Sequence, residues 1–470
     1  MVLESLIQFS HNLVSEFKKF IDVNWDESLD NLKSNFDNSK DSIQSSKILF
    51  ITQTPDHHTF PNKTEKLIEP FIKRFYNNSI ITDISNELLN AYYETIKEFH
   101  PKDKLPEDKI GSILYNYIVK LLIKECTGQL NDSWIKDYTK TLINDLLLKP
   151  REYIHIYEVL GIDLANQISL SENSATKLKI TNEVTLKQIN TNDFKDISSF
   201  AGFYGIKRVF VPKVGLIIRK EDYSGTNIDN LAYRVKELMQ IYYLKDIAFG
   251  NKYTFVKSMT YQTIFHKMEL YKRPTGGRIL LDSVKFHKFT NFVKNLLPKI
   301  INVFANDTKE FLRHSINRYC RALDSSTNVD YRLLYSVLAL EPLFIKEFEG
   351  KEIIKDRTIN ITSKVKDRVI KFGKCWGKDL FKFAEKLELA YNYRNDIVHC
   401  NPYPKDWHNE FSSLSFNLLS HIRDIIIYYL YYFNRDRLRI IDFIDKSMIS
   451  NETEQKLTKY VTQMKEKLQI

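Results

Sequence analysis

An arginine and a histidine lie five positions apart near the C-terminal end of this 470-residue chain. Arg394 is followed directly by Asn395 and Asp396, and then by His399. A guanidinium keeps its positive charge and can bond two phosphate oxygens, whereas an imidazole exchanges a proton near neutral pH. RNA carries its own nucleophile, the 2′-hydroxyl. Cleavage therefore needs a base to take that proton and a cation to stabilise the phosphorane, and His399 and Arg394 suit these two roles.

The five-residue spacing raises a geometric difficulty. On an ideal helix, five positions correspond to a rotation of about 140°, so the side chains of Arg394 and His399 diverge. Asn395 and His399 share a face instead, because they are four positions apart. The arginine and the histidine can converge only if the helix end unwinds or a second subunit contributes. The proline-containing loop 401–404 is expected to end this helix.

The sequence around the motif has a recognisable helical pattern. The motif closes an amphipathic stretch at 380–391, and a long apolar stretch follows at 408–433. Upstream, residues 340–343 read Leu-Glu-Pro-Leu within an apolar helix. The motif resembles the R-x4-6-H signature of HEPN ribonucleases. Residues 305–435 look most like the Apea-like branch of that family, whose members often serve in bacterial defence and toxin systems.

This resemblance implies a homodimer whose two motifs face each other across one cleft, formed by the C-terminal bundle. It implies metal-independent cleavage that leaves a 2′,3′-cyclic phosphate. Asn395 would then orient the phosphate or His399, and Asp396 would position the motif. The family context implies an anti-phage, abortive-infection effector. The unpaired cysteines indicate reduced thiols, so we expect a cytoplasmic protein. Residues 1–285 would sense a trigger, such as a phage component or nucleic acid. The alternative is a non-catalytic HEPN dimerisation or nucleic-acid-binding scaffold.

Three features of the sequence differ from the family pattern or have no assigned role in it. Some HEPN toxins carry a tyrosine two residues after the histidine, where this chain has Asn401. The family often has an arginine in the preceding helix, and Lys364, Lys366 and Arg368 are candidates. For Glu341 we expect a satisfied polar group inside the bundle.

Composition sets broad limits on function. Hydrophobic residues make up 43% and charged residues 27%, as in ordinary soluble proteins, and the net charge of +10 favours polyanions such as RNA. The four cysteines form no CxxC pair, and the Asp-His-His run at 56–58 has no identifiable third ligand. We therefore expect no metal and no cofactor. The longest apolar run, 425–433, is too short to cross a membrane and is read as a buried helix face.

The predicted fold is mainly α, with four segments. Residues 1–150 form a mostly helical region in which 48–51 is either a strand or a buried helix turn. Residues 151–285 form an α+β module. Residues 286–450 form a HEPN-type helical bundle, and 451–470 form one more amphipathic helix. Within the α+β module we expect strands at 153–157, 175–180 and 209–218, helices starting near 191–193 and covering 230–243, and a turn at 274–277.

Overall fold

The computed structural model describes the C-terminal half of the chain almost continuously and the N-terminal half in separate segments. The described residues are 2–24, 48–50, 71, 114, 117–119, 121–122, 124–125, 130–146, 151–164, 177–189, 208–210, 214–222, 226–256, 264–266, 278–306, 309–346, 361–403 and 405–470. The expected helix start at 191–193, the turn at 274–277 and the run at 56–58 lie outside these residues.

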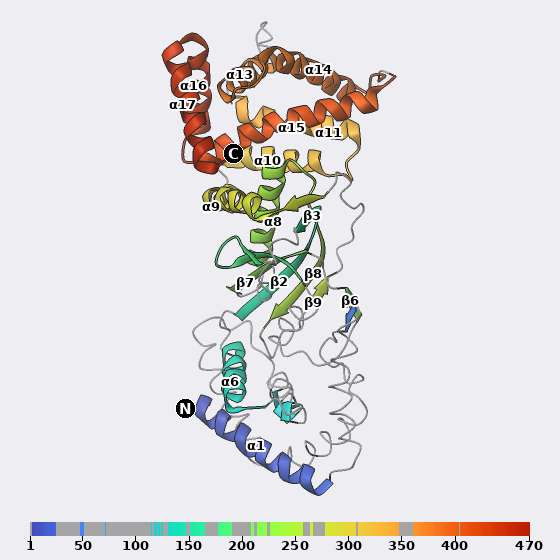
Figure 1. Cartoon of the computed structure of the whole chain (residues 1–470), viewed down its shortest axis with the longest axis vertical. Coiled ribbons are helices and arrows are strands. Elements are labelled where there is room, and N and C mark those ends of the chain that lie inside the picture. Colours follow the sequence, from blue (N-terminus) through green and yellow to red (C-terminus); the bar gives the residue numbers. More distant parts are fainter. Residues whose placement is uncertain are drawn as a thin grey trace, which may run out of the picture.

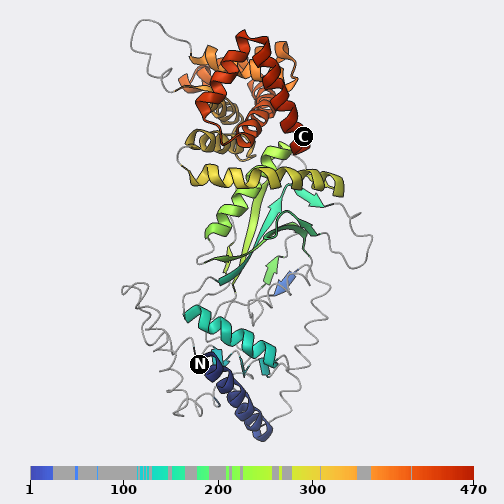
Figure 2. The same cartoon turned by 90° about the vertical axis from the view of Figure 1, so that its left-hand side faces the viewer.

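The molecule is elongated and mostly helical, with a small antiparallel sheet (Figures 1 and 2). The N-terminal helices lie at one end, the sheet lies in the middle and a bundle of helices lies at the other end. The mainly α class predicted from the sequence is confirmed at this level. None of the described helices is long and apolar enough to cross a membrane.

Two helices define the described N-terminal part, α1 (Val2–Asn24) and α6 (Asp132–Leu146). The apolar stripe of α1 is buried at Leu6, Leu13 and Phe17, as the helical spacing predicts. The run at 48–50 forms a strand, β1 (Ile48–Phe50), which pairs antiparallel with β6 (Arg208–Phe210). The choice left open by the sequence is thereby resolved in favour of a strand.

Six strands form the central antiparallel sheet, in the order β4-β5-β7-β2-β8-β9. They are β2 (Arg151–Leu160), β4 (Lys177–Lys179), β5 (Val184–Gln188), β7 (Val214–Asp222), β8 (Ala248–Val256) and β9 (Ile264–His266). The single strand predicted at 209–218 is wrong, because this segment contributes to two strands, β6 and β7, in different sheets. Pro212 stands between them and has no amide hydrogen for a strand ladder.

Helix α8 (Thr226–Tyr243) packs against the sheet and leads toward the bundle. A short parallel pair, β3 (Ile162–Leu164) with β10 (Ile279–Leu281), precedes the first bundle helix. The buried side chains of α8, the sheet and the bundle form one continuous hydrophobic core. The α+β module is therefore joined to the bundle by packed side chains.

Eight described helices build the C-terminal part: α9 (Ser283–Ala305), α10 (Glu310–Leu323), α11 (Val329–Phe344), α13 (Ile361–Trp376), α14 (Leu380–His399), α15 (Trp407–Tyr431), α16 (Arg437–Ile449) and α17 (Asn451–Leu468). The apolar run beginning at Ile425 is buried in α15 through Leu430, as predicted. Helix α17 packs against α9, α13 and α16 and contributes to the same core. The domain layout and the HEPN identity of this bundle remain predictions.

Candidate functional site

The arginine–histidine motif lies in the last turns of α14. Helical structure continues through His399, after which Cys400 adopts a left-handed conformation with φ 57°. The amide of Asn401 donates to the carbonyl of Asp396 at 2.9 Å, which closes the helix end with a Schellman-type turn. The helix therefore ends through this turn, before Pro402 is reached, and its last turn is not unwound.

Arg394 is anchored to a neighbouring helix. Its Nη2 lies 3.5 Å from Oε1 of Glu341 on α11, and its Nη1 donates to Oδ1 of Asn395 at 3.2 Å. The side chains of Arg394 and Glu341 are 28% and 23% exposed, so this ion pair is partly buried but still accessible to water. Burial raises the pKa of Glu341, and the charges of Arg394 and Arg318 oppose that rise. Arg394 thus presents a cation whose direction is set by α11.

Asn395 and Asp396 have different surroundings. The Asn395 side chain is exposed and accepts the hydrogen bond from Arg394. The Asp396 carboxylate accepts a hydrogen bond from Nδ2 of Asn401 at 2.9 Å, so it braces the turn that follows the helix. Of the two, only Asn395 contacts Arg394, whereas Asp396 stabilises the local backbone.

His399 is the last residue of α14, and its side chain is exposed. It forms no hydrogen bond or ion pair with any described residue of the chain. A free imidazole at the surface is accessible to a substrate as a proton acceptor. The connection between α14 and α15 lies at the end of the bundle opposite to α16 and α17 (Figure 1).

Arg394 and His399 are not brought together within one chain. Because α14 stays helical between them, their side chains diverge by about 140°. The first of the two routes to convergence, an unwound helix end, is therefore absent from the described structure. A second copy of the chain is the remaining route.

An aromatic cluster holds the connection that follows the motif. The ring centroids of Tyr403 and Trp407 are 5.0 Å apart, and those of Tyr393 and Phe411 are 4.8 Å apart. Tyr403 also contacts Phe411 at 5.3 Å, so the cluster links the loop to both helices. Burial, a hydrogen bond to Glu410 and nearby carboxylate charge raise the pKa of Tyr393 to about 12. These contacts fix the position at which α14 ends.

The candidate basic residues in the preceding helix have structural partners. Arg368 is buried and donates to both carboxylate oxygens of Asp445, at 2.7 and 2.9 Å, and to the carbonyl of Phe344 at 2.6 Å. Lys366 forms an ion pair with Glu388 on α14. Arg368 therefore ties α13 to α16 and to the end of α11, and its guanidinium is directed into the bundle.

A histidine–carboxylate contact lies between α8 and the sheet, away from the motif. Nδ1 of His155 is 3.1 Å from Oδ1 of Asp229, and Nζ of Lys252 is 2.6 Å from the same oxygen. Tyr157 also donates to Asp229. Burial lowers the pKa of His155, which is only 2% exposed. These donors converge on one carboxylate that fastens the start of α8 to β2 and β8, away from the motif.

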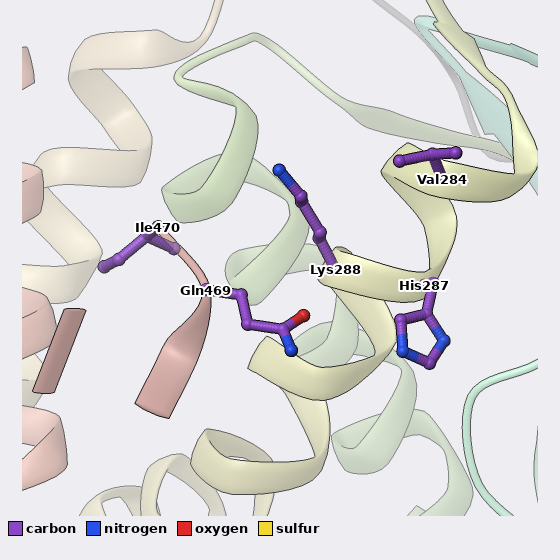
Figure 3. A pocket seen from close by; sticks show the side chains of 5 residues that line it. All are labelled: Val284, His287, Lys288, Gln469 and Ile470. Atoms are coloured by element: carbon purple, nitrogen blue, oxygen red, sulfur yellow. The ribbon is translucent and has the colours of Figure 1, made fainter. Parts of the chain in front are cut away.

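A hollow of about 690 Å³ lies between the start of α9 and residues 469–470 (Figure 3). Its described lining consists of Val284, His287, Lys288, Gln469 and Ile470. No carboxylate side chain is among these described residues. Across the described residues, no three histidine, cysteine, aspartate or glutamate side chains gather as metal ligands would.

Comparison with known proteins gave no match to a family model, to a curated protein or to a solved structure. The likeness to HEPN ribonucleases therefore rests on the motif and on the helical pattern around it. The sequence did not indicate that Glu341 contacts Arg394. Its position in an apolar helix was the only signal that it had a partner inside the bundle.

Proposed function

We propose that this chain is a metal-independent HEPN-type endoribonuclease in which Arg394 and His399 cleave RNA through its 2′-hydroxyl. The observation that carries the proposal is the contrast between the two side chains at the end of α14. His399 is exposed and free among the described residues, whereas Arg394 is half-buried and directed by Glu341. Phosphoryl transfer needs an accessible proton acceptor and an oriented cation, and two copies of the chain would have to bring these groups together.

In the proposed reaction, His399 takes the proton of the 2′-hydroxyl, and the 2′-oxygen attacks the adjacent phosphorus. The bond from phosphorus to the 5′-oxygen breaks, and that oxygen takes a proton from water. The protonated His399 then releases its proton to the solvent. The products are a 2′,3′-cyclic phosphate and a free 5′-hydroxyl. Arg394 stabilises the negative charge that builds on the phosphorane oxygens, because its guanidinium stays protonated throughout.

The divergence of the two side chains makes a homodimer part of this proposal. Each chain carries one motif, and a regular α14 directs its two functional groups apart. Two copies meeting through the C-terminal bundle would place Arg394 of one copy beside His399 of the other. Asn395 lies on the same helical face as His399 and would orient the phosphate or the imidazole.

The biological role follows from the family resemblance alone. We expect a cytoplasmic anti-phage, abortive-infection effector whose residues 1–285 detect a phage-derived trigger and restrain the nuclease. The continuous core between α8 and the bundle offers a physical connection for such restraint.

A non-catalytic scaffold is the second candidate. It is favoured by the contact between Arg394 and Glu341, because an arginine paired inside its own chain can serve the fold alone. In that case the basic chain would bind nucleic acid without cutting it.

Incubation of the purified full chain with total RNA, with and without EDTA, distinguishes the two candidates. We expect cleavage that persists in EDTA and is lost in His399→Ala. Arg439→Ala is the matched control, since Arg439 is exposed on α16 at the opposite end of the bundle. Intact RNA with the wild-type protein, or equal cleavage by His399→Ala, would favour the scaffold.

A further inference from the structure

Several arginine and tyrosine side chains on α10 and α11 are partly or fully exposed. Tyr331 is 49% exposed, and the centroid of its ring lies 6.4 Å from that of Tyr335. The guanidinium of Arg321 lies 5.9 Å from the centre of the Tyr335 ring. Arg318, one turn earlier on α10, donates to the carbonyl of Leu338 at 2.8 Å. We call Arg318, Arg321, Tyr331 and Tyr335 the arginine–tyrosine surface.

This surface leads to the proposed catalytic arginine. Tyr331, Tyr335 and Leu338 recur at helical spacing on the part of α11 that is not fully buried, and Glu341 follows at the next turn. Glu341 contacts Arg394, and Arg318 is close enough to influence the Glu341 carboxylate. Tyr331 and Glu341 are ten positions apart on the helix, which corresponds to about 15 Å along its axis. The surface therefore forms a path along α11 toward Glu341, the partner of Arg394.

The chemistry of the path matches a single-stranded nucleic acid. Exposed aromatic rings stack on unpaired bases, and arginine side chains contact the phosphates between them. The carboxylates near its start already have partners: Asp330 accepts from the amide of Tyr331 at 2.8 Å, and Asp324 accepts from the amide of Ser326 at 2.8 Å. Arg321 remains exposed, and Arg318 uses one of its several donors on Leu338.

We infer that the arginine–tyrosine surface binds the single-stranded RNA that flanks the scissile phosphate, with Tyr331 stacking on a base and Arg321 contacting phosphate. The inference rests on the proposed ribonuclease function, because it names how that site holds its substrate. It makes the enzyme selective for unpaired RNA, since bases inside a duplex cannot reach Tyr331.

The test measures binding without cleavage. The full chain carrying His399→Ala is titrated against a short unstructured RNA, followed by fluorescence anisotropy at several salt concentrations. Tyr331→Ala should weaken binding roughly 5- to 100-fold, the range expected for loss of one base stack, and Tyr331→Phe should restore it. Arg321→Ala should weaken binding and reduce the slope of log K against log salt by about 0.7, the value for one phosphate contact on a single strand.

Two exposed residues elsewhere provide matched controls. Phe381 is 89% exposed at the start of α14, and Arg439 is exposed on α16. Phe381→Ala and Arg439→Ala should leave RNA affinity unchanged. Tyr331→Ala should also leave the salt slope unchanged, because stacking releases no counterions. An RNA duplex of the same sequence should bind equally well to the parent protein and to Tyr331→Ala.

Unchanged affinity in Tyr331→Ala and Arg321→Ala overturns the inference. A shift of the dimer dissociation constant without a change in RNA affinity also overturns it, because the surface would then contact a second copy of the chain. If the wild-type protein cleaves RNA but these variants bind normally, RNA binding by the arginine–tyrosine surface is disproved and the proposed ribonuclease function is supported. If the wild-type protein does not cleave RNA but the variants lose affinity as stated, RNA binding by the surface is supported and the ribonuclease function is disproved.

Discussion

The guanidinium of Arg394 lies 3.5 Å from the carboxylate of Glu341, and this contact joins α14 to α11. Arginine is a long side chain that loses much rotational freedom when it is held in one direction. A carboxylate that fixes this direction before substrate arrives reduces the entropy lost on reaching the transition state. The same contact also holds two helices together, so its role in the reaction must be separated from its role in the fold.

The first prediction concerns this pair. Glu341→Gln keeps the size of the side chain but removes its charge, so Arg394 loses its fixed orientation. We expect the single-turnover rate of RNA cleavage to fall about 10-fold, which corresponds to about 1.4 kcal/mol of transition-state stabilisation. Glu388→Gln is the matched control, because Glu388 is an exposed carboxylate that pairs with Lys366 instead. A normal cleavage rate in Glu341→Gln would show that the contact between Glu341 and Arg394 serves the fold alone.

The second prediction concerns the dimer. Arg394→Ala and His399→Ala should each be inactive alone. When the two variants are co-refolded in equal amounts, about half of the dimers are mixed, and each mixed dimer contains one composite site with both groups intact. We therefore expect about a quarter of the wild-type activity. Sedimentation should show a dimer in the same samples. A fully active monomer would contradict the shared site.

The third prediction separates Arg368 from the motif. Its side chain is buried and bonded to Asp445 and to the carbonyl of Phe344. Arg368→Ala leaves the Asp445 carboxylate without this partner, so the free energy of unfolding should fall by about 3 kcal/mol. Denaturant unfolding measures this change. A stable Arg368→Ala protein that has lost RNA cleavage would instead place Arg368 in the catalytic machinery.

The fourth prediction concerns acid stability. Burial and the charges of Lys378, Lys386 and Arg423 lower the pKa of His421 to about 3. In the unfolded chain His421 has an ordinary pKa near 6.5. Below that pH the unfolded chain therefore binds a proton at His421, whereas the folded protein does not. The free energy of unfolding therefore keeps its full value above about pH 6.5, and the contribution from His421 is lost as the pH falls toward 3. His421→Gln should show a weaker loss of unfolding free energy between pH 7.5 and pH 5. Equal pH dependence in both proteins would exclude His421 as the cause.

Helical spacing predicted the elements around the site because each has an amphipathic or apolar pattern. The apolar stretch of α15 and the helix that ends in the motif are both found where the sequence indicated. The strand at 153–157 is the centre of β2, since its β-branched and aromatic residues suit a buried strand. These signals depend only on neighbouring residues, so they can be read from the sequence without knowledge of the tertiary structure.

Contacts between distant segments could not be read in the same way. Glu341 and Arg394 belong to different helices, and nothing in the sequence states which carboxylate meets which arginine. Likewise, the buried partner of Arg368 is Asp445, which comes from α16. The left-handed residue that ends α14 is Cys400 rather than glycine or asparagine, so the usual sequence marker of a helix end is missing.

One RNA, with and without a single 2′-deoxy nucleotide at the cleaved position, tests the proposed attack by the 2′-hydroxyl. We expect cleavage of the all-ribose RNA in EDTA, with a 2′,3′-cyclic phosphate at the new end. Cleavage should weaken as salt rises, because attraction to a basic protein depends on released counterions. The RNA with the 2′-deoxy substitution, and DNA of the same sequence, should bind but remain uncut at that position. Cutting at the deoxy position, or loss of all cleavage in EDTA, would contradict the mechanism assigned to Arg394 and His399.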